Sequence, residues 1–238
     1  MGVDATIGLM HREHEEAFET LGASLNDSTV RAEYERPGND YRTSVLPRLL
    51  GGILIGLGNF VYGRRPSYLK FRAVEVIARV PYHSWETAAY TLLTLFYRNE
   101  ERALRLTETA RFGRFAQDNE TMHVVVISAL AAKNGARGGM RYALFPVLFA
   151  WFYFWASYVL YLLRPKWSFE LNYLFENHAY QQYSKFIEKN ADVLRTRPMD
   201  SEFLRRYGRN PRSELEFFER VRNDELIHRN QSLSAMRT

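Results

Sequence analysis

Two short motifs of the form Glu-x-x-His constrain this chain more than any other feature. They are Glu120-Thr121-Met122-His123 and Glu225-Leu226-Ile227-His228. On a helix, side chains three positions apart lie on one face, so each motif presents a carboxylate and an imidazole together. Two such motifs, with one inward glutamate from each of two further helices, form the ligand set of the di-iron carboxylate four-helix bundles. The sequence therefore predicts an all-α, ferritin-like four-helix bundle that holds two metal ions.

A candidate for the lone glutamate precedes each motif. Glu176 lies before the second motif. Before the first, Glu75 and Glu86 fall on a shared helical face, and spacing alone allows either as the ligand. The chain order is then Glu, Glu-x-x-His, Glu, Glu-x-x-His, which is a twofold pseudo-repeat.

The composition limits the chemistry that such a site could use. The chain contains no cysteine, which excludes disulfides, thiolate ligands and iron–sulfur clusters. Carboxylate and imidazole ligands suit iron or manganese. The net charge is +5, but no Lys/Arg tract is interleaved with stacking aromatics, so we expect no nucleic-acid partner. Basic residues beside long apolar segments fit lipid headgroups better.

The polar and apolar segments suggest one main domain. Residues 1–40 are polar and mixed in charge and end at Pro37-Gly38-Asn39-Asp40, so we expect a polar N-terminal arm followed by a bundle domain over residues 41–238. His11 and His14 in the arm are interpreted as part of a solvated helix. Bundle helices are predicted at 68–100, 102–133, 167–193 and 213–236, with a kink at Pro81 and an Arg-rich connector at 195–212.

Two apolar segments, at about 46–61 and 141–164, lie outside the four bundle helices. The first is short and flanked by arginines, which is typical of a helix in the membrane interface, although an ordinary buried helix fits as well. The second holds 20 uncharged residues over 144–163, enough to cross a bilayer. Its Trp and Tyr residues are spread along its whole length, whereas a spanning helix concentrates them at its ends. A single crossing would also separate the two half-sites, so we expect this helix to lie on the membrane. The amino terminus lacks the apolar region of a signal peptide, and secretion is not expected.

Four segments, in this order, resemble the alternative oxidases and are closest to the plastid terminal oxidase branch. Glu75-Val76-Ile77-Ala78-Arg79-Val80-Pro81 resembles the family's Glu-Thr-Ile-Ala-x-Val-Pro, and Asn119-Glu120-Thr121-Met122-His123 resembles Asn-Glu-x-Met-His. Glu176-Asn177-His178-Ala179-Tyr180, followed by Tyr183, resembles the plastid Glu-Ser-His-Ala-Tyr with its tyrosine. Asp224-Glu225-Leu226-Ile227-His228 resembles Asp-Glu-Ala-x-His.

The resemblance implies a complete site. It selects Glu75 over Glu86, and the implied ligands of two iron ions are Glu75, Glu120, His123, Glu176, Glu225 and His228. Glu120 and Glu225 are expected to bridge the ions, with one histidine on each. The resemblance also points to Asn119 and Asp224 as the groups that orient the imidazoles. Tyr183, on the helical face of Glu176, is the expected redox-active side chain.

The implied activity is oxidation of quinol by dioxygen, giving quinone and water. The resemblance also implies a homodimer that is bound to an inner or thylakoid-type membrane through the segments at 46–61 and 141–164, a monotopic anchor. The expected quinol pocket includes Lys70, Arg72, Val74 and Tyr180. Lys70 stands where the family has an arginine, so the resemblance does not identify the reductant. Two other functions stay open: a di-iron oxygenase, hydroxylase or desaturase acting on a lipophilic substrate, and a non-catalytic iron-binding bundle.

Overall fold

The computed structural model describes residues 15–136 and 138–237. Across these residues the chain is helical, and its one β-type pairing is an isolated bridge between Pro198 and Ser213. The predicted all-α class is therefore confirmed. His11 and His14 lie outside the described residues.

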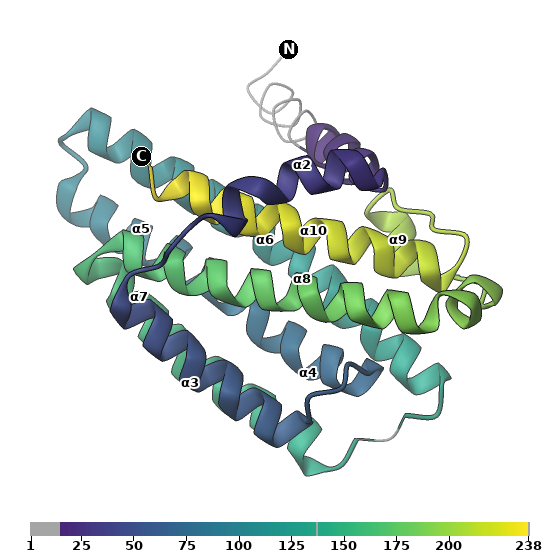
Figure 1. Ribbon diagram of the computed structural model, residues 1–238. Helices are drawn as coiled ribbons and strands as arrows, with labels where there is room; N and C mark the ends of the chain where they lie inside the picture. The colour runs from purple at the N-terminus through teal and green to yellow at the C-terminus, as the bar shows by residue number, and fades with distance from the viewer. Residues whose placement is uncertain (1–14, 137, 238) are drawn as a thin grey trace.

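The centre of the fold is a four-helix bundle (Figure 1). Its members are α4 (Tyr68–Ala78) with its continuation α5 (Val80–Phe96), α6 (Glu100–Lys133), α8 (Pro165–Thr196) and α10 (Glu214–Ala235). α8 packs along α10, and α4 and α5 pack on α6. A buried cluster draws Phe71, Ile127, Tyr183 and Phe218 from all four members. This cluster therefore joins all four members of the bundle.

One predicted helix is two helices in the structure. The expected single helix at 68–100 is broken at Arg79 and ends at Phe96. Pro81 has no N–H for the helical ladder, and its ring crowds the carbonyl four residues earlier, so the helix breaks two residues before it. The connector at 195–212 contains a short helix, α9 (Glu202–Arg206). Ser213 caps α10, because its hydroxyl oxygen accepts a hydrogen bond from the backbone N–H of Glu216.

α5 and α6 approach closely at Gly113. A Cβ at this position would lie 2.7 Å from the carbonyl oxygen of Tyr82, a backbone atom that cannot turn aside. Any larger residue would push the two helices apart. Gly113 therefore sets the spacing between the start of α5 and the helix that carries the first Glu-x-x-His motif.

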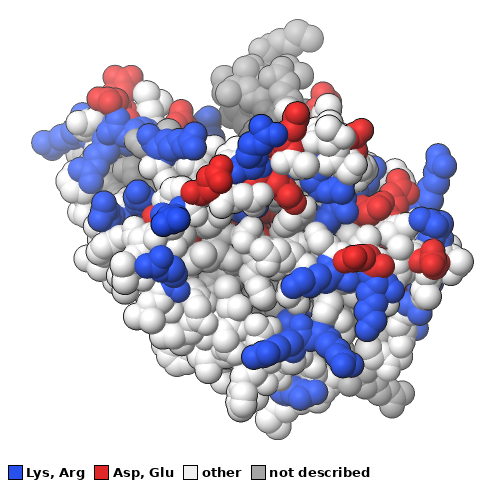
Figure 2. All heavy atoms as spheres, viewed as in Figure 1, with Lys and Arg blue, Asp and Glu red and all other residues white. Residues whose placement is uncertain are grey.

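Two apolar helices, α3 (Val45–Tyr62) and α7 (Leu144–Leu163), lie along one side of the bundle (Figure 1). Both are long and apolar enough to cross a membrane by length and composition. Their outer faces are exposed, with Phe60 at 87% and Trp151 at 58% of full exposure. In Figure 2 the surface over α3 is largely uncharged, with Lys and Arg towards its edges.

The N-terminal segment packs on the opposite side of the bundle. Residues 15–24 are helical, and α2 (Ser28–Asn39) crosses α10 (Figure 1). Phe18 and Leu25 are buried against Leu226 and Ile227 of α10. Residues 15–40, the part of the predicted polar arm that the structure describes, therefore contribute apolar contacts to the bundle.

Candidate metal centre

Six side chains from four helices converge at the middle of the bundle. Glu75 comes from α4, Glu120 and His123 from α6, Glu176 from α8, and Glu225 and His228 from α10. All six are buried. The i, i+3 spacing of each Glu-x-x-His motif turns its two side chains inward together, as helical geometry requires.

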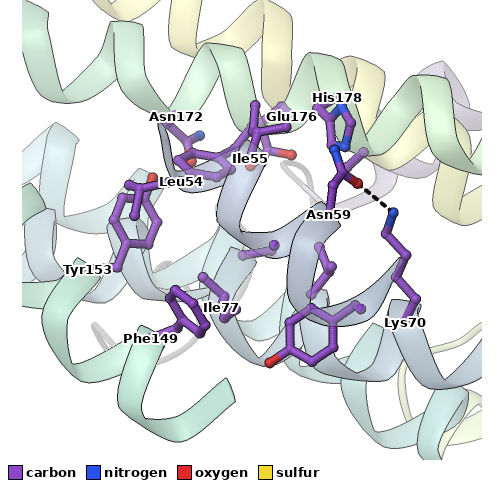
Figure 3. Close-up of a pocket in the computed structure, with 16 residues that line it drawn as sticks. Leu54, Ile55, Asn59, Lys70, Ile77, Phe149, Tyr153, Asn172, Glu176 and His178 are labelled. Carbon is purple, nitrogen blue, oxygen red and sulfur yellow. Dashed lines mark hydrogen bonds between the residues drawn. The ribbon is translucent and has the colours of Figure 1, made fainter. Parts of the chain in front are cut away.

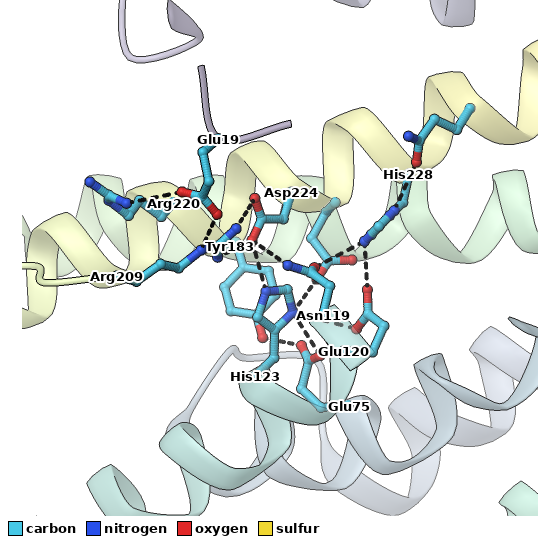
Figure 4. Close-up of polar contacts among 12 residues, drawn as sticks. Glu19, Glu75, Asn119, Glu120, His123, Tyr183, Arg209, Arg220, Asp224 and His228 are labelled. Atoms are coloured by element: carbon cyan, nitrogen blue, oxygen red, sulfur yellow. Dashed lines mark hydrogen bonds and ion pairs between the residues drawn. The ribbon is translucent and has the colours of Figure 1, made fainter. Parts of the chain in front are cut away.

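Short distances join the six side chains. Glu75, Glu120, His123 and Glu225 offer ligand atoms that all lie within 4.8 Å of one another. His123 Nδ1 lies 3.5 Å from Glu75 Oε2 and 3.4 Å from Glu120 Oε2 (Figure 4). The other oxygen of Glu120 lies 3.5 Å from His228 Nε2, so Glu120 stands between the two imidazoles. Glu176 is close enough to Glu120 and Glu225 for its charge to raise the pKa of both carboxyls.

Most carboxylate oxygens of this cluster lack a hydrogen-bond donor. Within the described residues, no donor reaches either oxygen of Glu120 or of Glu225, or the second oxygen of Glu75 and of Glu176. Burial raises the pKa of Glu120 and Glu225 well above the ordinary value and that of Glu176 to about 7. Unpaired buried charges cost several kcal/mol each. Divalent cations that prefer oxygen and imidazole ligands, such as Fe²⁺ or Mn²⁺, would remove this cost, so the residues fit a metal pair.

Each histidine is oriented by a residue from the helix that carries the other Glu-x-x-His motif. Asp224, beside Glu225 on α10, lies 3.0 Å from His123 Nε2. Asn119, beside Glu120 on α6, presents its side-chain oxygen 3.0 Å from His228 Nε2. The amide of Asn119 also donates to Asp224 at 3.3 Å. These contacts fix the ring planes and leave Nδ1 of His123 facing the carboxylates.

Arg209, from the connector before α10, extends this network to the N-terminal segment. Its guanidinium donates to Asp224 Oδ2 at 2.5 Å and to Glu19 Oε1 at 2.5 Å (Figure 4). Burial opposes ionisation of Asp224, but Arg209 and His123 outweigh it and hold the pKa of this carboxyl far below its usual value. Arg209 therefore keeps Asp224 ionised as an acceptor for His123.

The substitution Arg209→Ala is expected to destabilise the protein by about 3–5 kcal/mol, because it leaves Asp224 buried without its cation. Metal affinity should fall about 10–100-fold, since the group that orients His123 is no longer held. Denaturant unfolding and competition with a chelator measure the two effects. Arg206→Ala, which removes an exposed pair with Glu202, is the matched control. Equal behaviour of the two variants would contradict this role for Arg209.

Two buried tyrosines donate to the lone glutamates. Tyr183 on α8 donates its hydroxyl to Glu75. Tyr82 on α5 donates to Glu176 Oε1 at 2.8 Å and accepts from Asn172 at 3.0 Å. Burial, reinforced by the neighbouring carboxylates, raises the pKa of both phenols well above the ordinary value.

A largely apolar cavity leads from the α3 and α7 side of the bundle to this centre (Figure 3). α3, α4, α7 and α8 line it, with Leu54, Phe149 and Phe175 among the apolar residues and Glu176 at the metal centre. Its polar side chains include Asn59, Lys70 and His178. The Lys70 ammonium donates to Asn59 Oδ1 at 2.9 Å and to the Gly63 carbonyl at 2.8 Å. Burial lowers the pKa of Lys70 and takes that of His178 down to about 4.

The predicted pocket residues divide into two groups. Lys70 and Val74 line the cavity. Arg72 is not among the lining residues; its guanidinium donates to the carbonyl of Tyr142. Tyr180 is also absent from the lining, because it points to the opposite side of α8 and donates to Glu35 of α2. Glu86, the alternative first ligand, pairs with Arg114 at 2.6 Å and does not enter the centre.

Several residues of the site were not predicted from the sequence. Arg209 was read only as part of an Arg-rich connector. Asn59 and Asn172 enter through tertiary packing and leave no local signal. Tyr82 did have a local sequence signal, because it follows Glu75 by seven residues, as Tyr183 follows Glu176.

Four glutamates and two histidines at the centre of a four-helix bundle define the class of carboxylate-ligated metal bundles. Within this class, the family model named "Alternative oxidase" matches residues 63–235, and the chain belongs to the alternative oxidase family. The chain is also 26% identical over 136 residues to "Ubiquinol oxidase 4, chloroplastic/chromoplastic" of Arabidopsis thaliana. That alignment covers 57% of this chain and 36% of the plant protein, so the chain matches about a third of its relative's length.

Proposed function

We propose that this chain is a membrane-associated quinol oxidase, which couples the oxidation of quinol to the reduction of dioxygen to water at a pair of iron ions. The observation that carries the proposal is the cavity between α3, α4, α7 and α8. It is apolar along its walls, polar at Lys70 and His178, and ends at Glu176, a residue of the metal cluster. A reductant with an apolar tail and a polar ring fits such a cavity. The family membership and the printed name of the plant relative support the same reaction.

The six clustered side chains would hold the iron ions. Glu120 faces both imidazoles and is suited to bridge, and Glu225 contacts His123 Nδ1 at 3.5 Å. Glu75 and Glu176 would be terminal ligands, and His123 and His228 would bind one ion each. The iron pair would supply electron transfer to dioxygen. Tyr183, which donates to Glu75, is the proposed redox-active side chain, and Asn119 and Asp224 hold the imidazoles.

The position of the apolar helices supports the proposed monotopic membrane association. α3 and α7 pack along the bundle and expose one apolar side, including Leu49 and Ile53 of α3 and Trp151 and Phe152 of α7. Such a surface, with cations at its edges, is suited to the interfacial region of a bilayer. We propose an inner or thylakoid-type membrane and, from the family resemblance, a homodimer.

The test is oxygen uptake by the iron-loaded protein reconstituted in lipid vesicles. With a quinol as reductant and cyanide present, we expect one dioxygen to be consumed for two quinols, with water as the product. No uptake from iron-loaded protein would contradict the proposal. Uptake that yields an oxygenated or desaturated lipid in place of water would assign the chain to the oxygenase alternative.

A further inference from the structure

The hydrogen bonds at the metal centre repeat across its two halves. Tyr183 on α8 donates to Glu75 on α4, and Tyr82 on α5 donates to Glu176 on α8 (Figure 4 shows the Tyr183 half). Each phenol thus contacts the lone glutamate of the opposite half-site. Both tyrosines are buried, at 0% and 1% of full exposure for Tyr82 and Tyr183.

The sequence explains this symmetry. Tyr82 follows Glu75 by seven residues, and Tyr183 follows Glu176 by seven residues. Seven residues are about two helical turns, so on each helix the tyrosine lies on the face of its own glutamate. Although α4 and α5 are broken at Arg79, Tyr82 still points inward. The twofold pseudo-repeat of the ligands therefore includes a tyrosine in each half.

We propose that Tyr82 is a second redox-active tyrosine, which gives one electron and one proton during dioxygen reduction as Tyr183 does. The inference rests on the proposed oxidase function. Tyr82 has a proton acceptor in place, since its hydroxyl already donates to Glu176 at 2.8 Å. A quinol in the proposed cavity would be a nearby reductant, because Glu176 and Asn172, the two hydrogen-bond partners of Tyr82, both line that cavity.

The electron count accommodates a second donor of this kind. Reducing dioxygen to two waters takes four electrons and four protons. A ferrous pair held by the six clustered side chains would supply two of these electrons. Tyr183 and Tyr82 give one more each: the O–H bond of the phenol breaks, the electron goes to dioxygen, the proton passes to Glu75 or Glu176, and a neutral phenoxyl radical remains. The two protons on the glutamates and two protons from the quinols complete the two waters. Over the turnover, two quinols supply four electrons and four protons: two of each restore the phenols, two electrons restore the metal pair, and the quinols leave as quinones.

Other buried tyrosines lack this arrangement. Tyr173 donates to the carbonyl of Gly38 at 2.6 Å, and the hydroxyl of Tyr153 has no hydrogen-bond partner among the described residues. Tyr161 packs in the same apolar cluster as Tyr82 but donates to no glutamate of the centre in the hydrogen bonds of the described chain. Tyr161→Phe is therefore a matched control for the loss of a buried phenol.

The test uses the full chain without quinol. Protein loaded anaerobically with ferrous iron is mixed with dioxygen and freeze-quenched, and the tyrosyl radical is measured by electron paramagnetic resonance, normalised to iron content. Ring-deuterated tyrosine assigns the signal. We expect Tyr82→Phe and Tyr183→Phe each to retain about half of the wild-type signal, the double variant to lose it, and Tyr161→Phe to match wild type.

Three results would overturn the inference, two of them in the variants. One is a Tyr82→Phe signal equal to that of wild type, and the other is a Tyr183→Phe signal no larger than that of the double variant at equal iron content. Absence of a radical in wild type would also reject it. Quinol turnover is measured separately on wild type, so a failed oxidase assay with a Tyr82 radical present rejects only the proposed function.

Discussion

Glu120→Gln is expected to reduce quinol oxidation at least about a hundredfold. Glu120 is fully buried, and its two oxygens face His123 and His228 at 3.4 Å and 3.5 Å. A carboxamide of the same shape has no charge to neutralise a metal pair and cannot bridge it through two oxygens. Metal ions contribute several kcal/mol of charge stabilisation to such reactions, and each 1.36 kcal/mol corresponds to about a tenfold change in rate. Oxygen uptake in lipid vesicles measures the loss.

The control for this substitution is Glu86→Gln. Glu86 lies on the same predicted helical face as Glu75, but it pairs with Arg114 at the surface of the bundle. Exposed pairs of this kind contribute about 0–1 kcal/mol, so this variant should keep wild-type activity. Full activity in Glu120→Gln, or equal losses in both variants, would show that Glu120 does not bind the metal.

Removal of the metal ions is expected to lower the midpoint of thermal unfolding by about 10 °C. The four glutamates would then face one another without a cation, and their unpartnered oxygens would repel. Ligand binding at about a thousand times Kd stabilises a protein by about 4 kcal/mol, and each kcal/mol shifts the midpoint of a chain of this size by about 2–4 °C. Differential scanning calorimetry before and after chelation measures the change, and added Fe²⁺ or Mn²⁺ should reverse it.

The variant Glu120→Gln gives this prediction an internal check. In metal-free protein the substitution removes one of the clustered carboxylates and should raise the midpoint above that of the metal-free wild type. Added metal should then raise the midpoint less than it does in the wild-type protein. A wild-type midpoint that does not respond to metal would mean that the buried glutamates are satisfied in another way.

The ligand set was the most predictable part of this molecule. The i, i+3 spacing of Glu120 with His123 and of Glu225 with His228 is fixed by the helical repeat, so a local pattern already determines which side chains meet. The choice between Glu75 and Glu86 was different, because both lie on one helical face. The break at Arg79 separates the two, with Glu75 in α4 and Glu86 in α5.

Residues that reach the centre across long sequence distances were not predictable. Arg209 contacts Asp224 from a connector and Glu19 from the other end of the chain, 190 residues away. Asn59 is only 11 residues from Lys70, but the two side chains meet only because the chain turns between α3 and α4 and both helices line the cavity. Such contacts depend on how helices pack, which no periodicity records. Tyr82 is an intermediate case, since its spacing from Glu75 was visible but gained meaning only beside the equivalent Tyr183.

The structure also separates the two sides of the centre. The apolar cavity opens towards the apolar helices α3 and α7, whereas Arg209 and Glu19 connect the centre to the N-terminal segment on the other side. A lipophilic reductant bound in this cavity, as proposed, would be kept apart from the charged groups that orient His123.

The most direct test of the account is anomalous diffraction at the iron absorption edge from crystals of the iron-loaded protein. We predict two anomalous peaks inside the bundle, among Glu75, Glu120, His123, Glu176, Glu225 and His228. A single peak, or peaks bound elsewhere on the chain, would contradict a shared metal pair at these six residues and the oxidase function derived from it.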